Sequence, residues 1–212
     1  MTAAEPVVRM TGISIEFPGV KALDGVDFRL FPGEVHSLMG ENGAGKSTLI
    51  KALTGVYKID SGSIEVAGAE RRFHGTADAQ AAGISTVYQE VNLCPNLTIG
   101  ENVMLGHEVR GPFGINWSAT HRAATRALAK LGLARLDPRR PLSSLSIALQ
   151  QLVAISRAVA TDSRVLILDE PTSSLDAAEV EQLFAVVRRL RDEGVAILFV
   201  SHFLDQVYEI SD

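Results

Sequence analysis

The sequence has little cysteine and no long apolar run. Cys94 is the single cysteine among 212 residues, so an internal disulfide is excluded and a reducing compartment is favoured. The longest apolar run near the C-terminus, residues 195–200, is far shorter than the roughly 18 residues that a membrane span needs. The N-terminus has no basic region followed by an apolar one, so no secretory signal is visible. We expect a soluble, cytoplasmic chain that meets a membrane only through a partner.

The sequence also has no excess of positively charged residues. The formal net charge is −5 and the sequence pI is about 5.6, which argues against a protein that binds nucleic acid through bulk charge. The hydrophobic fraction of 46% and the charged fraction of 21% are ordinary for a chain that buries a core, and they exclude disorder as the dominant state. The length fits one domain.

Turn residues divide the chain into alternating strands and helices. The segment 118–131 carries its apolar residues on one helical face, with Ser118 predicted as the N-cap and Gly132 as the stop signal. We therefore predict an α/β fold with a helical subdomain inserted at about residues 91–160. The pattern predicts strands over 7–17, 26–30, 34–39, 63–67, 84–88, 165–168 and 195–200, and helices over 47–54, 118–131 and 177–192.

Residues 40–48 match the phosphate-binding pattern G-x-x-x-x-G-K-[ST]. Glycines allow positive φ, so successive N–H groups can point at a phosphate, and the following helix offers its N-terminus to the anion. An accidental glycine-rich turn is the alternative, but the position between an apolar strand and a helix favours the phosphate loop. We predict that Lys46 binds the β- and γ-phosphates, Ser47 binds Mg²⁺ and Thr48 supports the α-phosphate. The remaining predicted nucleotide contacts are Gly40, Glu41, Asn42, Gly43, Ala44 and Gly45.

Two carboxylates follow the apolar run 165–168. Open α/β sheets place ligands at the carboxyl ends of their strands. Taken alone, Asp169 and Glu170 could be solvated acids at a strand end. Beside a phosphate loop they supply what phosphoryl transfer needs: we predict that Asp169 holds Mg²⁺ and that Glu170 polarises the attacking water.

In their order and spacing these motifs resemble those of ATP-binding cassette (ABC) ATPases. Gln89 stands where that family has its Q-loop glutamine, Asp176 falls in the D-loop and His202 follows the last strand as the H-loop histidine. Ser146 belongs to a segment similar to the family signature, and Phe17 lies where the family stacks an aromatic ring on adenine. The resemblance implies a P-loop NTPase core with a mixed sheet, antiparallel N-terminal strands and an inserted helical subdomain. It also implies ATP and Mg²⁺ as ligands, with Gln89 contacting metal or water and His202 the γ-phosphate.

Each of these residues also has a structural interpretation. Gln89 and His202 could be surface residues, Phe17 could belong to the core, and Asp176 could only cap the following helix. The signature departs from the usual Leu-Ser-Gly-Gly-Gln, because Ile147, Ala148 and Leu149 replace its last three residues. Ala148 adds a methyl group where backbone would approach a ligand.

The sequence around the motifs resembles bacterial monosaccharide importers of the ribose, xylose and galactose kind. That resemblance implies an ATPase subunit at the cytoplasmic face of the inner membrane, with an integral membrane permease and, indirectly, a periplasmic sugar-binding protein as partners, and no nucleic acid. In that family two cassettes lie in tandem or pair head to tail, so a second nucleotide-binding domain is expected from the same polypeptide or a homodimer. We interpret residues 1–212 as a single cassette, the first of such a pair, and expect it to be C-terminally truncated. A non-transport cassette that clamps nucleic acid or a protein, and a monomeric NTPase, remain the alternatives.

Overall fold

A computed structural model of the protein describes residues 5–41, 43–88 and 93–212. The chain divides into two compact units. Unit 1 contains Met1–Thr86, Arg164–Glu170 and Arg191–Asp212, and unit 2 contains Val87–Ser163 and Pro171–Leu190. The single cassette domain over 1–212 and the limits of the helical subdomain at about 91–160 stay predictions.

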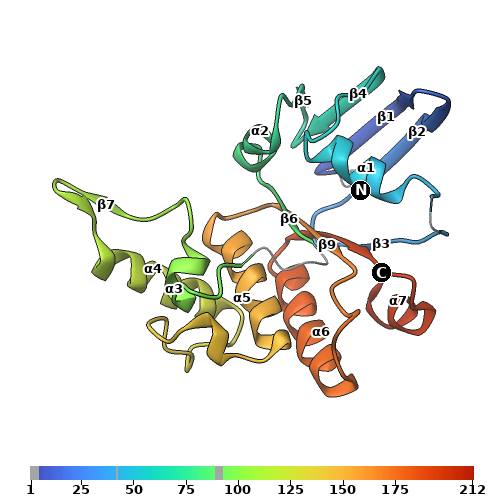
Figure 1. The fold of residues 1–212 in the computed structure, drawn as a ribbon. Coiled ribbons are helices and arrows are strands. Elements are labelled where there is room, and N and C mark those ends of the chain that lie inside the picture. Colours follow the sequence, from blue (N-terminus) through green and yellow to red (C-terminus); the bar gives the residue numbers. More distant parts are fainter. Residues whose placement is uncertain (1–4, 42, 89–92) are drawn as a thin grey trace. The chain divides into compact units, whose positions relative to one another are not determined.

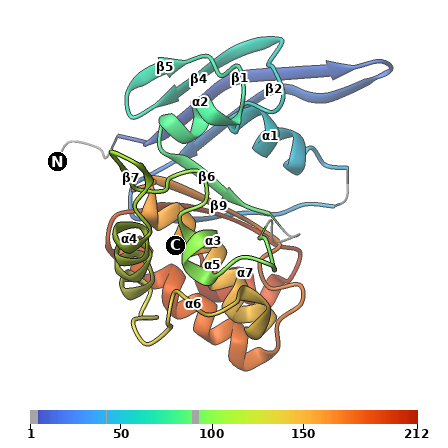
Figure 2. The same cartoon turned by 60° about the vertical axis from the view of Figure 1, so that its left-hand side comes forward.

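Unit 1 contains an antiparallel sheet of four strands in the order β2-β1-β4-β5, which lie side by side in Figure 2. The strands are β1 (Val8–Phe17), β2 (Val20–Leu30), β4 (Ser61–Val66) and β5 (Ala69–Arg71). In β1 the buried positions are 8 and 10, then 13 and 15, so the alternation shifts by one residue. The pairing with β2 and β4 shifts at the same place, and Gly12 there has a φ of 61°. A β-bulge therefore explains why this strand alternates only loosely in the sequence.

The second sheet of unit 1 has the strand order β3-β10-β9-β6, of which Figure 1 labels β3, β9 and β6. These strands are β3 (Val35–Leu38), β10 (Ala196–Val200), β9 (Val165–Asp169) and β6 (Ile84–Val87), and β10 is parallel to both β3 and β9. Every residue of β10 and all of β9 except Asp169 is buried, as predicted for apolar runs in a parallel sheet. One apolar core joins both sheets to α1 (Lys46–Leu53) and α2 (Thr76–Ala81).

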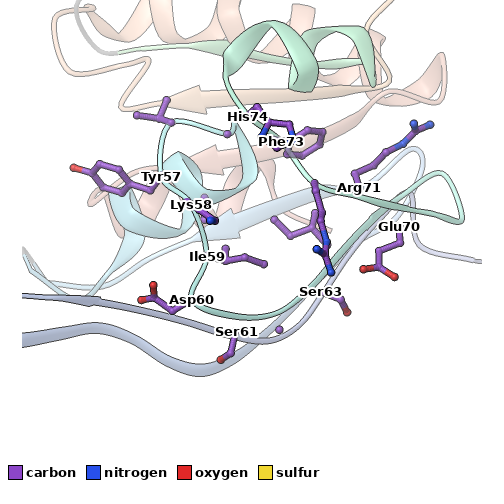
Figure 3. Close-up of a pocket in the computed structure, with 16 residues that line it drawn as sticks. Tyr57, Lys58, Ile59, Asp60, Ser61, Ser63, Glu70, Arg71, Phe73 and His74 are labelled. Carbon is purple, nitrogen blue, oxygen red and sulfur yellow. The ribbon is translucent and has the colours of Figure 1, made fainter.

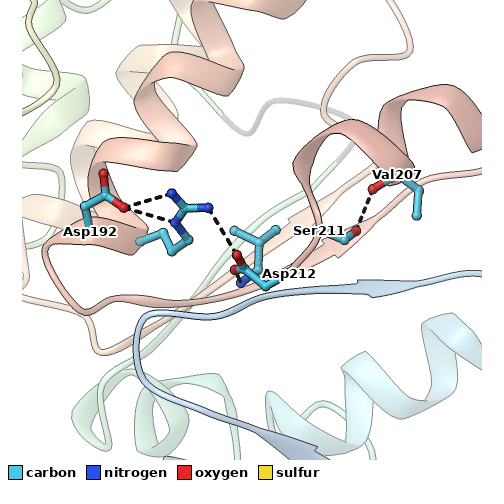
Figure 4. Close-up of polar contacts among 6 residues, drawn as sticks. Asp192, Val207, Ser211 and Asp212 are labelled. Carbon is cyan, nitrogen blue, oxygen red and sulfur yellow. Dashed lines mark hydrogen bonds and ion pairs between the residues drawn. The ribbon is translucent and has the colours of Figure 1, made fainter.

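The end of the described chain is attached to β3 (Figure 4). After α7 (Leu204–Ile210), the Asp212 backbone N–H donates to the carbonyl of Val35 at 3.2 Å, and its carboxylate accepts from the Val35 N–H at 2.9 Å. The guanidinium of Arg191 bridges Asp212 and Asp192, at 3.2 and 2.9 Å. Ser211 Oγ donates to the carbonyl of Val207 at 2.7 Å, which closes the last turn of α7. These contacts fix α7 within unit 1.

Unit 2 is mainly helical. It contains α3 (Ile99–Val103), α4 (Trp117–Lys130), the 3₁₀ turn Leu142–Ser144, α5 (Ile147–Ala160) and most of α6 (Ala177–Asp192). Buried residues of α3, α4 and α5 form its apolar cluster. A short hairpin of β7 (Arg110–Gly111) and β8 (Gly114–Ile115) precedes α4.

The predicted elements are present, mostly with shifts of one or two residues, and α6 has its predicted bounds. The strand predicted over 26–30 is longer than expected, because β2 begins at Val20. The prediction of Ser118 as N-cap is wrong. Asn116 is the N-cap, because its side-chain oxygen accepts from the Ala119 N–H at 3.0 Å, while the Ser118 hydroxyl accepts from the Arg122 guanidinium at 2.7 Å. Gly132, with a φ of 79°, follows the end of the helix as predicted. In the described part of the chain, no helix is both long and apolar enough to cross a bilayer.

Candidate functional site

The glycine-rich loop joins β3 to α1 within unit 1. Gly40, Gly43 and Gly45 have φ values of 152°, 89° and 89°, so the positive backbone angles expected of a phosphate loop are present. A Cβ added at Gly45 would lie 2.9 Å from the carbonyl oxygen of Ala22, which leaves no room for a side chain. The loop is exposed around these glycines, and the next residues, Lys46 to Thr48, begin α1. The described part of the loop therefore combines positive φ values with a following helix N-terminus, the features that a phosphate loop needs.

Lys46 turns back over this loop. Its ammonium donates to the carbonyl of Glu41 at 3.0 Å and to the carbonyl of Gly40. The side chain is half-buried, and its charge acts on the carboxylate of Asp169 at the end of β9. Lys46 thus contacts the loop and acts electrostatically on Asp169, while its predicted contact with the β- and γ-phosphates stays a prediction.

Asp169 and Glu170 lie where β9 ends. Burial raises the pKa of Asp169, and the neighbouring Glu170 adds to this rise, while Lys46 and Lys51 oppose it. Glu170 has a φ of 49°, in the left-handed region that glutamate rarely adopts, and its N–H donates to the carbonyl of Val200 at 2.9 Å. Such backbone strain is concentrated at functional sites.

His202 faces Glu170. The parallel register pairs Asp169 with Val200, so the residues that follow both strands meet at one edge of the sheet. His202 Nδ1 lies 2.9 Å from Glu170 Oε2; the glutamate side chain is 17% exposed and the histidine side chain 59%. The imidazole is therefore accessible from outside, while the carboxylate it contacts is sheltered. Glu170 and His202 are 32 positions apart in the sequence, and Lys46 lies far earlier in the chain. The strand order of the sheet brings them together within unit 1.

Phe17 ends β1 and is 37% exposed, so it is not a core residue. Its ring lies 5.2 Å from the ring of Tyr57 in an edge-to-face arrangement. Lys51 in turn lies over the Tyr57 ring, at 5.1 Å from its centroid. The sequence interpretation did not include Tyr57, and only its position soon after the helix of the phosphate loop could have indicated it.

Ser146 and Asp176 belong to unit 2, and each begins a helix. Ser146 is the N-cap of α5 and accepts from the Leu149 N–H at 3.4 Å. Asp176 accepts from the Glu179 N–H at 2.9 Å and donates its own N–H to the Glu179 carboxylate at 3.2 Å, a reciprocal cap of α6. The capping role considered for Asp176 is thus present. In the signature segment Ala148 is buried, whereas Ile147 is 57% exposed.

Two predicted site residues, Asn42 and Gln89, lie outside the described residues. Among the described residues, no group of three or more His, Cys, Asp or Glu side chains could hold a metal ion by itself.

A separate hollow of about 530 Å³ lies on unit 1 between the end of α1, β4 and β5 (Figure 3). Tyr57, Ile59 and Phe73 supply apolar lining, and Lys58 and Arg71 are among its charged residues. None of the residues in the phosphate loop or at the ends of β9 and β10 lines it. The hollow is distinct from the predicted phosphate site.

Similarity to known proteins places the chain in a family. Residues 23–173 match the ABC transporter family. The chain is 71% identical over its whole length to the fructose import ATP-binding protein FruK of Bifidobacterium longum (strain NCC 2705). It is 53% identical, over 98% of its length, to the galactofuranose transporter ATP-binding protein YtfR of Escherichia coli (strain K12). It spans 41% of the length of each of these two relatives.

Solved structures agree with this assignment. The ATP-binding cassette MJ1267 of an ABC transporter, in its ADP conformation, matches with a TM-score of 0.87 and 27% identity over 98% of this chain and 85% of that one. The α/β fold predicted from the sequence is confirmed by this match and by the two sheets of unit 1. The chain belongs to the ABC transporter family.

Proposed function

We propose that this chain binds and hydrolyses ATP as the nucleotide-binding subunit that powers the import of a sugar through a membrane permease. The observation that carries the proposal is the meeting, within unit 1, of the glycine-rich loop, Lys46, the carboxylates after β9 and the histidine after β10. Family membership and the names of the relatives, which import fructose, galactofuranose and ribose, support the same function.

The triphosphate of ATP would lie in the glycine-rich loop. Lys46 would leave the loop carbonyls and place its ammonium on the β- and γ-phosphates, and the backbone N–H groups at the start of α1 would bind the same anion. Ser47 and Asp169 fit Mg²⁺, because one is exposed at the first turn of α1 and the other is a half-buried carboxylate within reach of the Lys46 charge. The ion would neutralise charge that develops on the phosphates.

Glu170 and His202 would act on the attacking water. The Glu170 carboxylate is sheltered, directly follows β9 and lies next to His202, so it can orient the water and accept its proton. His202, whose side chain is largely exposed, would donate a hydrogen bond to the γ-phosphate. Phe17 would stack on adenine from the end of β1, and Gln89 would contact the metal or the water.

Ser146 and Asp176 would complete the nucleotide site of a second cassette. Ser146 lies at the N-terminus of α5, where the helix dipole favours a phosphate, and Asp176 caps the start of α6 with its carboxylate. The second cassette would come either from the same longer polypeptide, since the chain spans 41% of its relatives, or from a second copy. The chain would lie at the cytoplasmic face of the inner membrane. There it would act on an integral permease and, indirectly, with a periplasmic sugar-binding protein.

Nucleotide binding and hydrolysis test the first part of this proposal. Lys46→Ala is expected to weaken ATP binding in calorimetry by at least about tenfold, because a charge-assisted contact to phosphate is lost. Lys58→Ala, which removes an exposed lysine of the separate hollow, is the matched control and is expected to bind ATP as the parent does. Equal affinities for all three proteins would contradict the assigned role of Lys46.

Mixing experiments test the second cassette. A Lys46→Ala chain lacks a working phosphate loop but keeps Ser146, while a Ser146→Arg chain has the reverse defect. If the sites are shared between two copies, the mixture gains ATPase activity that neither variant has alone. No gain, with the unmodified chain active, would exclude a shared site between copies.

Copurification tests the transport partner. Capture of an integral permease from membranes of the source organism is expected, and salt-sensitive binding of nucleic acid would instead support the clamp alternative.

A further inference from the structure

The hairpin of unit 2 and the residues beside it contain several exposed apolar side chains. Of the thirteen large apolar side chains that are exposed in the described part of the chain, five lie within residues 105–117. Phe113 is 104% exposed, which means that nothing in the fold covers it. The other four are Leu105, Val109, Ile115 and Trp117, between 36% and 46% exposed. Apolar side chains gathered in this way mark an interaction surface.

The geometry of the hairpin presents Phe113 at a projecting tip. Phe113 lies in the two-residue turn between β7 and β8, and the hairpin extends beyond α3 and α4 (Figure 1). Arg110 pairs with Ile115 across the hairpin, so a cation and an apolar side chain share one face. The base is fixed, because the Asn116 N–H donates to the carbonyl of Val109 at 2.7 Å and the Val109 N–H donates to Thr120 Oγ1 at 3.1 Å. Hydrogen bonds therefore fix the base of the hairpin, and its tip projects from that base.

The segment is basic in an acidic chain. Residues 105–126 contain three arginines, at positions 110, 122 and 126, and one acid, Glu108, which gives a net charge of +2 against −5 for the whole chain. The Glu108 carboxylate accepts from the N–H of Gly106 at 3.1 Å, and hydrogen bonds to backbone N–H groups lower its pKa. The Glu108 carboxylate is thus hydrogen-bonded within its own loop. The arginines of α4 and β7, in contrast, are exposed to solvent.

We propose that this hairpin inserts its aromatic tip into the surface of an anionic lipid bilayer. Tryptophan and phenylalanine favour the boundary between headgroups and acyl chains, and arginines beside them are attracted to anionic headgroups. A projecting tip of this kind fits a fluid layer, in which Phe113 needs no preformed pocket. Ile115 and Trp117 follow it into the boundary, with Arg110 beside them at headgroup level.

Trp117 provides the measurement, because it is the single tryptophan of the chain. The full 212-residue chain is mixed with vesicles of phosphatidylcholine alone or with 30% phosphatidylglycerol, and both tryptophan emission and cosedimentation are recorded. A blue shift and cosedimentation are expected with anionic vesicles at low salt, and both fall as salt screens the arginines. The readout involves no nucleotide, so failure of the proposed ATPase function would leave this test intact.

Matched variants distinguish membrane binding through the hairpin from nonspecific adsorption of the chain to vesicles. Phe113→Ser is expected to lower partitioning at least about tenfold, whereas Tyr208→Ser, at an 82% exposed aromatic of α7, is expected to leave it unchanged. Arg110→Gln is expected to lower partitioning by about fivefold on anionic vesicles only, with Arg72→Gln of the separate hollow as its control. Far-ultraviolet circular dichroism checks that each variant is folded. The proposal is overturned if tryptophan emission does not shift with anionic vesicles, or if the Phe113 and Tyr208 variants partition equally. It is also overturned if the hairpin binds an integral protein but not lipid.

Discussion

Replacing Glu170 with glutamine is the sharpest perturbation of the proposed site. The change keeps the size and shape of the side chain and removes only its charge and its capacity to accept a proton. The backbone φ of 49° is equally unfavourable for both residues, so it does not alter the free energy of unfolding. The contact to His202 at 2.9 Å weakens, but that imidazole is 59% exposed, which limits the effect on stability to about 1 kcal/mol.

The expected effect on hydrolysis is much larger. A positioned general base contributes about 100-fold to 10,000-fold to a rate, so Glu170→Gln should slow ATP hydrolysis by at least about 100-fold. That factor corresponds to about 2.7 kcal/mol of transition-state stabilisation. ATP binding should persist, because the phosphate contacts of Lys46 and the loop are intact.

Single-turnover phosphate release gives the rate, and calorimetry gives the affinity for ATP. Glu193→Gln, at an exposed acid in the turn before β10, is the matched control and should behave as the parent. A Glu170→Gln protein that binds ATP and still hydrolyses it within about threefold of the parent would refute the assigned role.

Three further changes test other parts of the account. Tyr57→Ala should weaken ATP binding by up to about tenfold, because it removes the edge-to-face partner of Phe17, and Tyr57→Phe should restore it; calorimetry that finds equal affinities would contradict the link. Hydrogen bonds from the side chain and the N–H of Thr98 lower the pKa of Glu101 at the start of α3, so the stabilisation is present above its unfolded pKa and is lost as pH falls through the folded pKa. Urea unfolding of Glu101→Ala and the parent should therefore show a difference in the free energy of unfolding at pH 7 that narrows as the pH falls below the ordinary pKa of a glutamate, and a constant difference would exclude this linkage. Ala67 has a φ of 52° in the turn between β4 and β5, so Ala67→Gly should raise the free energy of unfolding by about 0.5–1 kcal/mol, and a lowered midpoint in thermal unfolding would count against the turn geometry.

The strongest sequence patterns predicted their elements well, for physical reasons. The apolar run at 165–168 is too short for a typical helix and fits a strand buried on both faces, and β9 has nearly that extent. The phosphate loop combines glycines with a preceding strand and a following helix, so its positive φ values follow from the residue types. The hairpin of β7 and β8 could not be predicted in this way, because strands of two residues have no periodicity.

Other features depend on geometry that no local pattern contains. The choice of Asn116 over Ser118 as N-cap depends on which side-chain oxygen reaches a free N–H, since both residue types favour that position. The contact between Glu170 and His202 depends on the parallel register of β9 and β10. The left-handed backbone of Glu170 has no sequence signal, because glutamate itself disfavours it.

The specific ATPase rate of this chain, measured against its own concentration, tests most directly whether the site is completed by a second cassette. If Ser146 and Asp176 act on the nucleotide of a second copy, the rate per chain rises with concentration and levels off once the pair is formed. An appreciable rate per chain that stays constant over the whole range would mean that one copy is sufficient, and would contradict the account.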